Sequence, residues 1–564
     1  MPTITPTTPA DLVHATWSDL APLYDDLAVA TIEGDVEGWL QRWSALQEVV
    51  EEAATMAMIA YTCDTADPDK EAANLRWSSE IFPNVMEQHV RLAQRLVEAG
   101  RVPAGMETVV REFRTDIEIF REQNVPLFAE LEELVAGYQK ATGTLSVEWD
   151  GQAITVPQLQ PFLRVADRAI RERAFRAGAD AYLAIKGDLS TLFDRMLAVR
   201  QQLATNAGFP DYMMYAFRAK HRFDYTPDDC ARFHEAVEAT VAPLVERLMT
   251  HRASVLGLDA VRPWDTLVQL ESREPVRPFT DAEGLVTPAQ RMFDALDPEL
   301  GARFREMSTD QLLDLTSRAG KAPGGYCTNL SWRKKPFIFM NAVGVPDDVN
   351  TLVHEAGHCF HDFSANRLPY LWQRSAGHEA AELASMSMEL LVAPHLVAPT
   401  GYYTPEQARA VEVEHLEDIL TSLAHIASVD AFQRWIYTSN QGHDGAARDA
   451  HWLEVRARFE RGVDWSGLDD ERVARWYRQL HIFELPFYYI EYGIAQMGAL
   501  QLWRDAQRDP AGTMARYKSF IALGGTQPLP DLYAAAGARL VFDRDGMAEL
   551  VALVEARIEA LRRG

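Results

Sequence analysis

The chain has 564 residues, and 55 lysines and arginines against 82 aspartates and glutamates give it a formal net charge of −27. Such an acidic surface repels phosphate backbones and anionic lipids, which argues against nucleic-acid binding and against attachment to a membrane surface. Hydrophobic residues make up 47% and charged residues 24% of the chain, which is the composition of an ordinary globular protein.

Cysteines and targeting signals narrow the class of protein further. The chain has four cysteines and no C-x-x-C pair, so the sequence predicts neither a disulfide scaffold nor a cysteine zinc site. Residues 1–17 lack the basic and apolar regions of a secretory signal, and the chain has no run of about 18 apolar residues. We therefore expect reduced thiols, no membrane-spanning helix and a cytoplasmic location.

Most of the chain repeats apolar residues at helical spacing, beginning with residues 36–61, which contain no glycine or proline after Gly38. Further segments with this pattern are 84–99, 106–140, 166–204, 227–256, 404–436 and 546–562. The sequence therefore predicts a mainly α protein. Gly208 and Pro210 mark the best break between helices, so we expect a helical N-terminal region, 1–200, and a second region, 201–564.

Strand signals are few. Residues 145–156 alternate apolar and polar residues around Asp150 and Gly151, which is typical of a β-hairpin. Two short runs rich in aromatic and β-branched residues, 326–332 and 336–341, follow the glycine-rich segment 320–325 and predict one small β-sheet.

Residues 346–363, PDDVNTLVHEAGHCFHDF, carry the most informative motif, and Pro346 predicts the start of a helix there. On that helix His354 and His358 are one turn apart, so both imidazoles lie on one face and can bind one Zn²⁺. Glu355 is rotated from them by about 100°, where its carboxylate reaches a water molecule but not readily the metal. This HExxH arrangement is typical of zinc metalloproteases, with the glutamate as general base.

A second helix is expected over residues 375–396, and it carries Glu379, Glu382 and Glu389 on one face. Carboxylates among methionine, leucine and alanine are costly to bury unless a cation or hydrogen bonds compensate them. A divalent ion held by the first helix would supply that compensation. The spacing alone leaves Glu379 and Glu382 open as the third ligand.

Neighbouring histidines do not fit the pattern of a metzincin, which would need glycine at 361 and histidine at 364. This chain has His361 and Ser364 at those positions, so the sequence excludes that class. We expect His361 and His378 to be packed, or to support the ligands from behind, rather than to bind the metal.

Three motifs together carry a family resemblance: HEAGHCFH at 354–361, AELASMSMELL at 381–391 and HIFELPFYYIEYGIAQ at 481–496. They resemble the thimet oligopeptidase / oligoendopeptidase F family, and in particular its Pz-peptidase-like oligoendopeptidases. The segments WDGQAITVPQLQPFL at 149–163 and GKAPGGYCTNL at 320–330 support the likeness. It runs from about residue 115 to the C-terminus.

The resemblance implies the third metal ligand and the architecture. In the family pattern the third zinc ligand is the glutamate before the small-residue–serine turn, here Glu382. The resemblance also implies one Zn²⁺ per chain, bound in a thermolysin-like (gluzincin) catalytic core within region 201–564. A large helical shell would enclose this core and leave a deep channel that admits only short peptides.

The oxyanion of the transition state needs a hydrogen-bond donor besides zinc. The candidates are His481, Tyr488, Tyr489 and Tyr492. Tyr488 and Tyr492 are four residues apart, hence on one helix face, and they resemble the tyrosines that this family directs at the metal. Because the spacing from His481 differs from that in the thimet branch, the choice among the four stays open.

Together these features predict a zinc-dependent endopeptidase that hydrolyses internal bonds of short peptides. Two alternatives remain: a zinc carboxypeptidase with a similar helical channel, and a peptide-binding protein that has lost activity. The intact HExxH motif and Glu382 argue against the second. The expected partners are short peptides, not nucleic acids or membranes, whereas the preferred peptide sequence and the oligomeric state stay open.

Overall fold

The computed structural model describes residues 8–270, 276–318, 320–322 and 324–563. Within these residues the chain forms 22 α-helices and two small β-sheets, which confirms the mainly α class. The chain folds as two compact units, each assembled from three stretches. The first contains Met1–Phe120, Arg277–Pro405 and Gly498–Leu540, and the second contains Arg121–Val276, Glu406–Met497 and Val541–Gly564.

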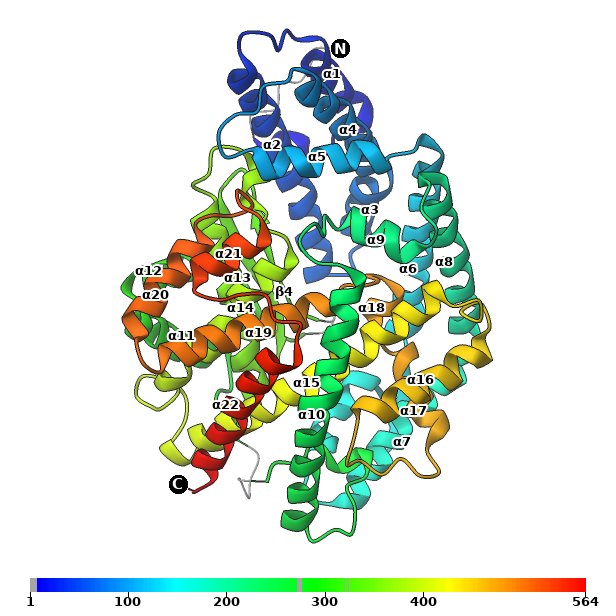
Figure 1. The fold of residues 1–564 in the computed structure, drawn as a ribbon, viewed down its shortest axis with the longest axis vertical. Coiled ribbons are helices and arrows are strands. Elements are labelled where there is room, and N and C mark those ends of the chain that lie inside the picture. Colours follow the sequence, from blue (N-terminus) through cyan, green and yellow to red (C-terminus); the bar gives the residue numbers. More distant parts are fainter. Residues whose placement is uncertain (1–7, 271–275, 319, 323, 564) are drawn as a thin grey trace. The chain divides into compact units, whose positions relative to one another are not determined.

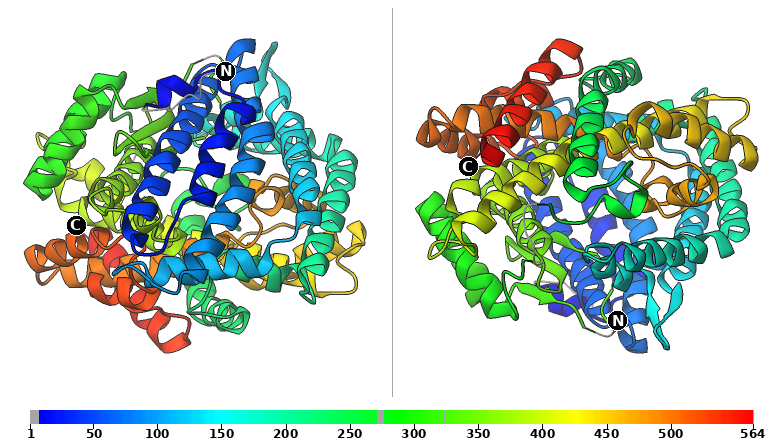
Figure 2. Two further views of the ribbon diagram at one scale, coloured as in Figure 1. Left: turned by 90° about the horizontal axis from the view of Figure 1, so that it is seen from above. Right: turned by 90° about the horizontal axis from the view of Figure 1, so that it is seen from below.

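The N-terminal helices belong to the first unit. Helix α2 (Val36–Cys63) covers the predicted segment 36–61, and it begins where the Asp35 carboxylate accepts a hydrogen bond from the Gly38 N–H at 3.0 Å. It packs beside α1 (Trp17–Val29), which also contacts α4 (Phe82–Glu98), as the blue helices in Figures 1 and 2 show. Helices α3 (Pro68–Leu75) and α5 (Glu107–Ile119) complete this part of the unit.

Helix α2 fastens these N-terminal helices to the later stretches of the first unit. The Arg374 guanidinium lies 2.7 Å from the Glu48 carboxylate, and the Leu371 N–H donates to the Ser44 hydroxyl at 2.9 Å. Arg374 is almost fully buried, so Glu48 provides the charge that such a guanidinium needs. The N-terminal helices are therefore part of the unit that carries the HExxH motif.

The first unit also contains a three-stranded sheet in the order β3–β5–β4. Strand β5 (Lys335–Ala342) pairs antiparallel with β4 (Tyr326–Leu330), and these are the two strands predicted from the sequence. Strand β3 (Leu313–Thr316) pairs parallel with β5 and was not expected, because a four-residue strand with alternating polar residues gives a weak signal. Pro323, in the glycine-rich segment before β4, lies outside the described residues.

Helices α13 (Pro346–Ala365) and α14 (His378–Leu391) follow the sheet and lie against each other (Figure 1). The start of α13 is fixed as the sequence predicts. Asp348 accepts hydrogen bonds from the backbone N–H groups of the three residues before Pro346, at 2.8–2.9 Å. The other helices of this unit are α11 (Ala282–Leu296), α12 (Pro298–Thr309), α20 (Pro510–Ile521) and α21 (Leu529–Ala536).

The second unit contains the predicted hairpin, β1 (Ser146–Trp149) and β2 (Gln152–Thr155), which turns at Asp150 and Gly151 with φ of 52° and 80°. Its long helices are α10 (Pro227–Leu256) and α15 (Pro405–Thr438), and α10 packs along α22 (Arg544–Arg563) (Figure 2, right). Its other helices are α6 (Val125–Gly143), α7 (Arg168–Ala184), α8 (Lys186–Ala207), α9 (Tyr212–Ala219), α16 (Gly445–Phe459), α17 (Asp469–Tyr477), α18 (Leu480–Phe483) and α19 (Tyr489–Ala506), the last as far as residue 497.

Gly208 ends α8 in the left-handed conformation, with φ of 85°, as the sequence signal at this position predicts. The division into regions 1–200 and 201–564 stays a prediction. Among the described residues, no helix combines the length and the apolar character that crossing a membrane requires.

Candidate metal centre

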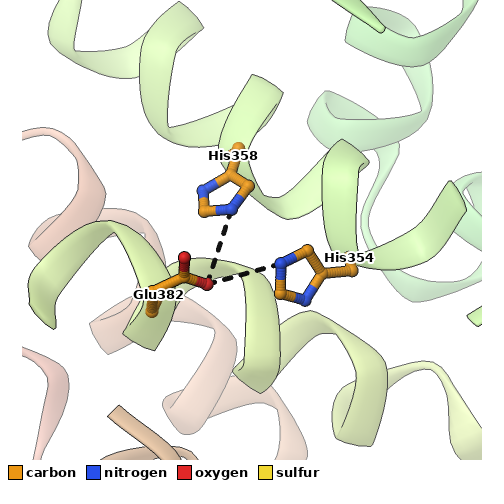
Figure 3. A group of neighbouring side chains, drawn as sticks. All are labelled: His354, His358 and Glu382. Carbon is orange, nitrogen blue, oxygen red and sulfur yellow. Dashed lines mark ion pairs between the residues drawn. The ribbon is translucent and has the colours of Figure 1, made fainter. Parts of the chain in front are cut away.

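The three predicted ligands, His354, His358 and Glu382, lie together where α13 packs on α14. Glu382 Oε2 lies 3.3 Å from His354 Nε2 and 3.6 Å from His358 Nε2 (Figure 3). The two imidazole rings are nearly perpendicular, and the three candidate ligand atoms all lie within 4.8 Å of one another. Glu382 is buried and both histidines are partly buried. In the described part of the chain, this is the one such group of three histidine, cysteine or acidic side chains.

Gly357 permits the close approach of the two helices. A Cβ atom at this position would lie 2.6 Å from the Ser385 Cα and 2.9 Å from the Ala384 carbonyl oxygen. Distances that short are repulsive, and both neighbours are backbone atoms that cannot rotate away. The glycine between the two histidines therefore brings Glu382 within reach of them.

Buried hydroxyl groups hold α14 and Glu382 in place. Tyr517 on α20 donates to the Ala384 carbonyl at 3.0 Å, and Tyr533 on α21 donates to the Glu379 carbonyl at 3.1 Å. The Ser385 hydroxyl donates to Glu382 Oε2 at 3.0 Å. The two tyrosines were not identified from the sequence, because the carbonyls they bind lie more than a hundred residues away along the chain.

Glu389 orients His354 from behind. Its Oε1 lies 2.6 Å from His354 Nδ1, and its Oε2 accepts a hydrogen bond from Asn350 Nδ2 at 2.9 Å. A carboxylate at Nδ1 holds a hydrogen there, so Nε2, the nitrogen beside Glu382, is the one left to bind a metal. The sequence placed Glu389 on the correct helix face but did not identify this partner.

The electrostatics of the group favour a cation. Burial opposes a charge on His354, but hydrogen bonds and charges from Glu382 and Glu389 outweigh it and raise its pKa well above the usual value. Burial lowers the pKa of His358 to about 4. Burial raises the pKa of Glu382, but the charge of His358 and a hydrogen bond from His354 outweigh this effect and lower the pKa to about 2. The same arrangement that holds a proton on His354 suits a divalent cation.

Glu355 lies on α13 beside the two histidines and is 8% exposed. Burial raises its pKa to about 7, against the lowering effect of the neighbouring His354. The backbone of Cys327 on β4 makes a hydrogen bond to its carboxylate, so the edge strand of the sheet fixes its position. A carboxylate with a pKa near neutrality is suited to general-base catalysis.

Models of known protein families show which family the chain belongs to. The model described as Peptidase family M3 matches residues 162–551, and the model described as Peptidase M3 N-terminal domain matches residues 14–118. The chain belongs to Peptidase family M3. The resemblance stated from the sequence is thereby confirmed, and it extends into the first hundred residues, where the sequence motifs gave no signal.

Two curated relatives of this M3 chain are similar over part of their length. An oligoendopeptidase F homolog of Mycoplasma pneumoniae is 23% identical over 396 residues, which cover 66% of this chain and 62% of that protein. Oligopeptidase PepF of Bacillus subtilis is 24% identical over 307 residues, which cover 52% of this chain and 43% of that protein. The matched part thus spans less than two thirds of either relative.

Solved structures match nearly the whole M3 chain. A structure of Pz peptidase A with an inhibitor has a TM-score of 0.89 and 25% identity and covers 96% of both chains. A structure of oligoendopeptidase-F from Enterococcus faecium has a TM-score of 0.66 over 97% of both chains, but at 14% identity it shows the fold alone. The M3 chain therefore shares the fold of these two structures over nearly its whole length.

The structure separates the glutamates and histidines that the sequence left open. Glu379 is buried on α14 but does not belong to the group of three, whereas Glu382 does. His361 is buried against the ring of Phe520, and His378 is exposed at the start of α14. Neither histidine belongs to the group of three, and of the two only His361 is packed in the interior.

The cysteines stay outside the metal group of the M3 chain as well. All four are free thiols. Cys359 directly follows His358, but its Sγ lies 3.3 Å from Cys327 Sγ, and Cys327 Sγ lies 3.7 Å from Asp362 Oδ2. Burial raises the pKa of Cys359, and the hydrogen bond with Cys359, together with burial, raises that of Cys327. Both side chains therefore remain neutral thiols.

The remaining candidates gather in the second unit. The ring of His481 lies 5.7 Å from that of Tyr488, 4.7 Å from that of Tyr489 and 6.1 Å from that of Tyr492. The Lys220 ammonium lies 5.1 Å from the centre of the Tyr488 ring. The residues that the sequence grouped are thus one aromatic cluster, and their role toward the metal group stays a prediction.

Proposed function

We propose that this M3 chain is a zinc-dependent oligoendopeptidase that hydrolyses internal bonds of short peptides. The observation that carries the proposal is the convergence of His354, His358 and Glu382, with the buried carboxylate of Glu355 on the same helix as the two histidines. This arrangement combines a metal-ligand set with a base of suitable pKa.

The donor set fits zinc. Two imidazole nitrogens and one carboxylate oxygen are the ligands of many catalytic zinc sites, which keep the fourth position open. Glu389 and Ser385 support that set, because they fix the orientation of His354 and of the Glu382 carboxylate. When bound, zinc supplies Lewis acidity and lowers the pKa of a water molecule toward about 7.

Glu355 moves the protons of the reaction in this proposal. Its carboxylate accepts a proton from the attacking water and then delivers it to the leaving amine. The hydrogen bond from the Cys327 backbone keeps the carboxylate in one orientation during both transfers. Because the carboxylate is buried, bulk water competes little for these protons.

The aromatic cluster supplies the hydrogen-bond donors for the oxyanion. Negative charge develops on the former carbonyl oxygen, and a phenol or an imidazole N–H placed beside it stabilises the transition state more than the substrate. Tyr488, Tyr492 and His481 are assigned this role from their place in the motif that resembles the family pattern. The clustering of their rings supports a common role.

Short peptides are the proposed substrates. The names of the relatives, an oligoendopeptidase F homolog and an oligopeptidase, describe enzymes of this kind. The deep channel that the family resemblance implies would exclude folded proteins. A cytoplasmic location stays a prediction, for which four free thiols are favourable.

A peptide library tests the proposal. The zinc-loaded enzyme is incubated with mixed ten-residue peptides and with casein, and the products are identified by mass spectrometry. We expect internal cleavage of the peptides, loss of activity with a chelator, recovery with Zn²⁺ and little digestion of casein. Stepwise removal of C-terminal residues would instead identify a carboxypeptidase, and no turnover by the zinc-loaded protein would indicate a peptide-binding protein.

A further inference from the structure

A chain of hydrogen bonds, called the relay below, leads to the aromatic cluster of the second unit; its members are Arg456, His425, Gln479 and His481. His425, on α15, has its Nε2 2.9 Å from Gln479 Oε1 and its Nδ1 2.9 Å from Arg456 Nη1, which belongs to α16. Gln479 Nε2 in turn lies 3.2 Å from His481 Nδ1 and 2.9 Å from the Tyr489 hydroxyl oxygen. One glutamine side chain therefore joins the pair formed by His425 and the buried Arg456 to His481.

The arginine fixes the direction of every hydrogen bond in this relay. A guanidinium only donates, so His425 Nδ1 accepts from Arg456 and the neutral ring carries its hydrogen on Nε2. That hydrogen needs an acceptor, which is the Gln479 Oε1 atom. The opposite orientation of the amide would place two donors against each other, so the amide has one allowed orientation.

The orientation of Gln479 then determines the tautomer of His481. The amide nitrogen donates one hydrogen to the Tyr489 oxygen and the other to His481 Nδ1. Because Nδ1 accepts, the neutral imidazole of His481 carries its hydrogen on Nε2. The hydroxyl oxygen of Tyr489 accepts a hydrogen bond from the same amide, so the hydroxyl hydrogen of Tyr489 points away from Gln479.

Charge and burial keep the relay in this state. Burial and the nearby charges of Arg456 and Arg475 lower the pKa of His425 to about 3, so the ring stays neutral at any working pH. Arg456 is 3% exposed and pairs with Glu460, which also contacts Arg472 and Arg475. Because Glu460 holds the guanidinium in place, the relay begins at a fixed donor.

We propose that Gln479, oriented by His425 and Arg456, is a positioning residue that presents His481 as a neutral imidazole with its hydrogen on Nε2. This inference rests on the proposed function, in which His481 donates a hydrogen bond to the oxyanion. An N–H at Nε2 stabilises negative charge, whereas a lone pair there repels it. The relay thus acts on catalysis only through His481.

The first test reads the tautomer directly. The nitrogen chemical shifts of His481 are measured by NMR in the full-length enzyme labelled with ¹⁵N-histidine, and the signal is assigned by its loss in His481→Ala. We expect a hydrogen on Nε2 and none on Nδ1 in the wild-type enzyme. In Gln479→Glu the carboxylate accepts from the ring, so Nδ1 gains a hydrogen. A wild-type ring with its hydrogen on Nδ1 would overturn the proposal without any variant.

The second test uses the pH profile. In Gln479→Glu, only the imidazolium form of His481 still donates from Nε2, because the neutral ring keeps its hydrogen on Nδ1. The kcat of this variant should therefore fall at least tenfold as pH rises through the new pKa of His481, with KM nearly unchanged. The kcat of the wild-type enzyme should not show this fall with rising pH. Gln501→Glu, a buried glutamine of the first unit that bonds to the Arg539 carbonyl, controls for destabilisation.

A double-mutant cycle separates positioning from structure. His481→Ala should lower kcat by about 10²–10³, and adding Gln479→Glu to it should lower kcat no further. A further loss of tenfold or more in the double variant would overturn the proposal, because Gln479 would then act through another group. Wild-type kcat in His481→Ala would overturn it as well, together with the role of His481, whereas Glu355→Gln judges the peptidase proposal separately.

Discussion

The metal group of the first unit and the aromatic cluster of the second unit place histidines in opposite surroundings. His354 contacts two carboxylates, Glu382 and Glu389, which favour positive charge at the ring. His425, behind the cluster, contacts an arginine and an amide and stays neutral. The comparison shows that carboxylates around a histidine favour a cation in the first unit, whereas burial and nearby arginines keep a histidine neutral in the second.

Loss of the base in the first unit should have the largest effect. We predict that Glu355→Gln lowers kcat by roughly 10²–10⁴ and retains zinc and fold, because the ligands stay and only proton transfer is lost. Zinc content, melting temperature and kcat are measured together, with Glu379→Gln as the control on the neighbouring helix. Near wild-type kcat in zinc-loaded Glu355→Gln would show that Glu355 is not the general base.

Loss of a donor in the second unit should have the next largest effect and should leave zinc unchanged. Tyr488→Phe and Tyr492→Phe, made separately, keep the rings but lose the hydroxyls. If either phenol donates to the oxyanion, its loss should lower kcat by about 10²–10³ with KM nearly unchanged. The control is Tyr182→Phe, a tyrosine of α7 in the same unit. If both variants keep more than about a tenth of wild-type kcat, the two tyrosines only pack.

Glu389→Gln tests the carboxylate surroundings of His354. The amide keeps a hydrogen bond to Nδ1 but loses the charge, so zinc affinity should fall by about 10–100-fold. Competition with a chelator of known affinity measures the change. Because Glu379 shares the helix but not the metal group, Glu379→Gln should keep wild-type affinity. Equal affinities in the two variants would show that the charge of Glu389 has no role.

Gly357→Ala tests the packing that joins the two ligand helices and should have the smallest effect of this series. Its Cβ would meet the backbone of Ser385, so α14 must shift, at a cost of about 1–3 kcal/mol in unfolding free energy. Zinc affinity should fall as well. Gly187→Ala on α8, where a Cβ meets nothing within 4 Å, is the control and should leave both quantities nearly unchanged. An equally stable Gly357→Ala would contradict the packing argument.

The two regions also differ in how much the sequence predicts. His354 and His358 were identified from their spacing alone, because one helical turn determines their relation. Glu382 and Glu389 were placed on the correct face, but only the family pattern separated Glu382 from Glu379. The structure explains why Glu382 is the one that reaches the histidines. The close backbone contact at Gly357 brings the turn of α14 around Ser385 next to them.

The relay of the second unit could not be predicted in this way. His425 and Gln479 are 54 residues apart, and neither stands in a motif, so no local spacing relates them. Tyr517 and Tyr533 were missed for the same reason, because their acceptors are backbone carbonyls that any sequence provides. Among the elements, the amphipathic helix α2 was predicted closely, whereas the short strand β3 was not. Local periodicity identifies elements and ligands, while contacts between distant segments require the fold.

The most direct test of the metal centre compares two glutamates on one helix. Glu382→Ala and Glu379→Ala are purified in parallel, dialysed against a weak chelator and analysed for bound zinc. Because Glu382 lies in the group with both histidines and Glu379 does not, Glu382→Ala should lose most of its zinc and Glu379→Ala should retain it. Equal retention in the two variants, or greater loss in Glu379→Ala, would contradict the assignment of His354, His358 and Glu382 as the metal centre.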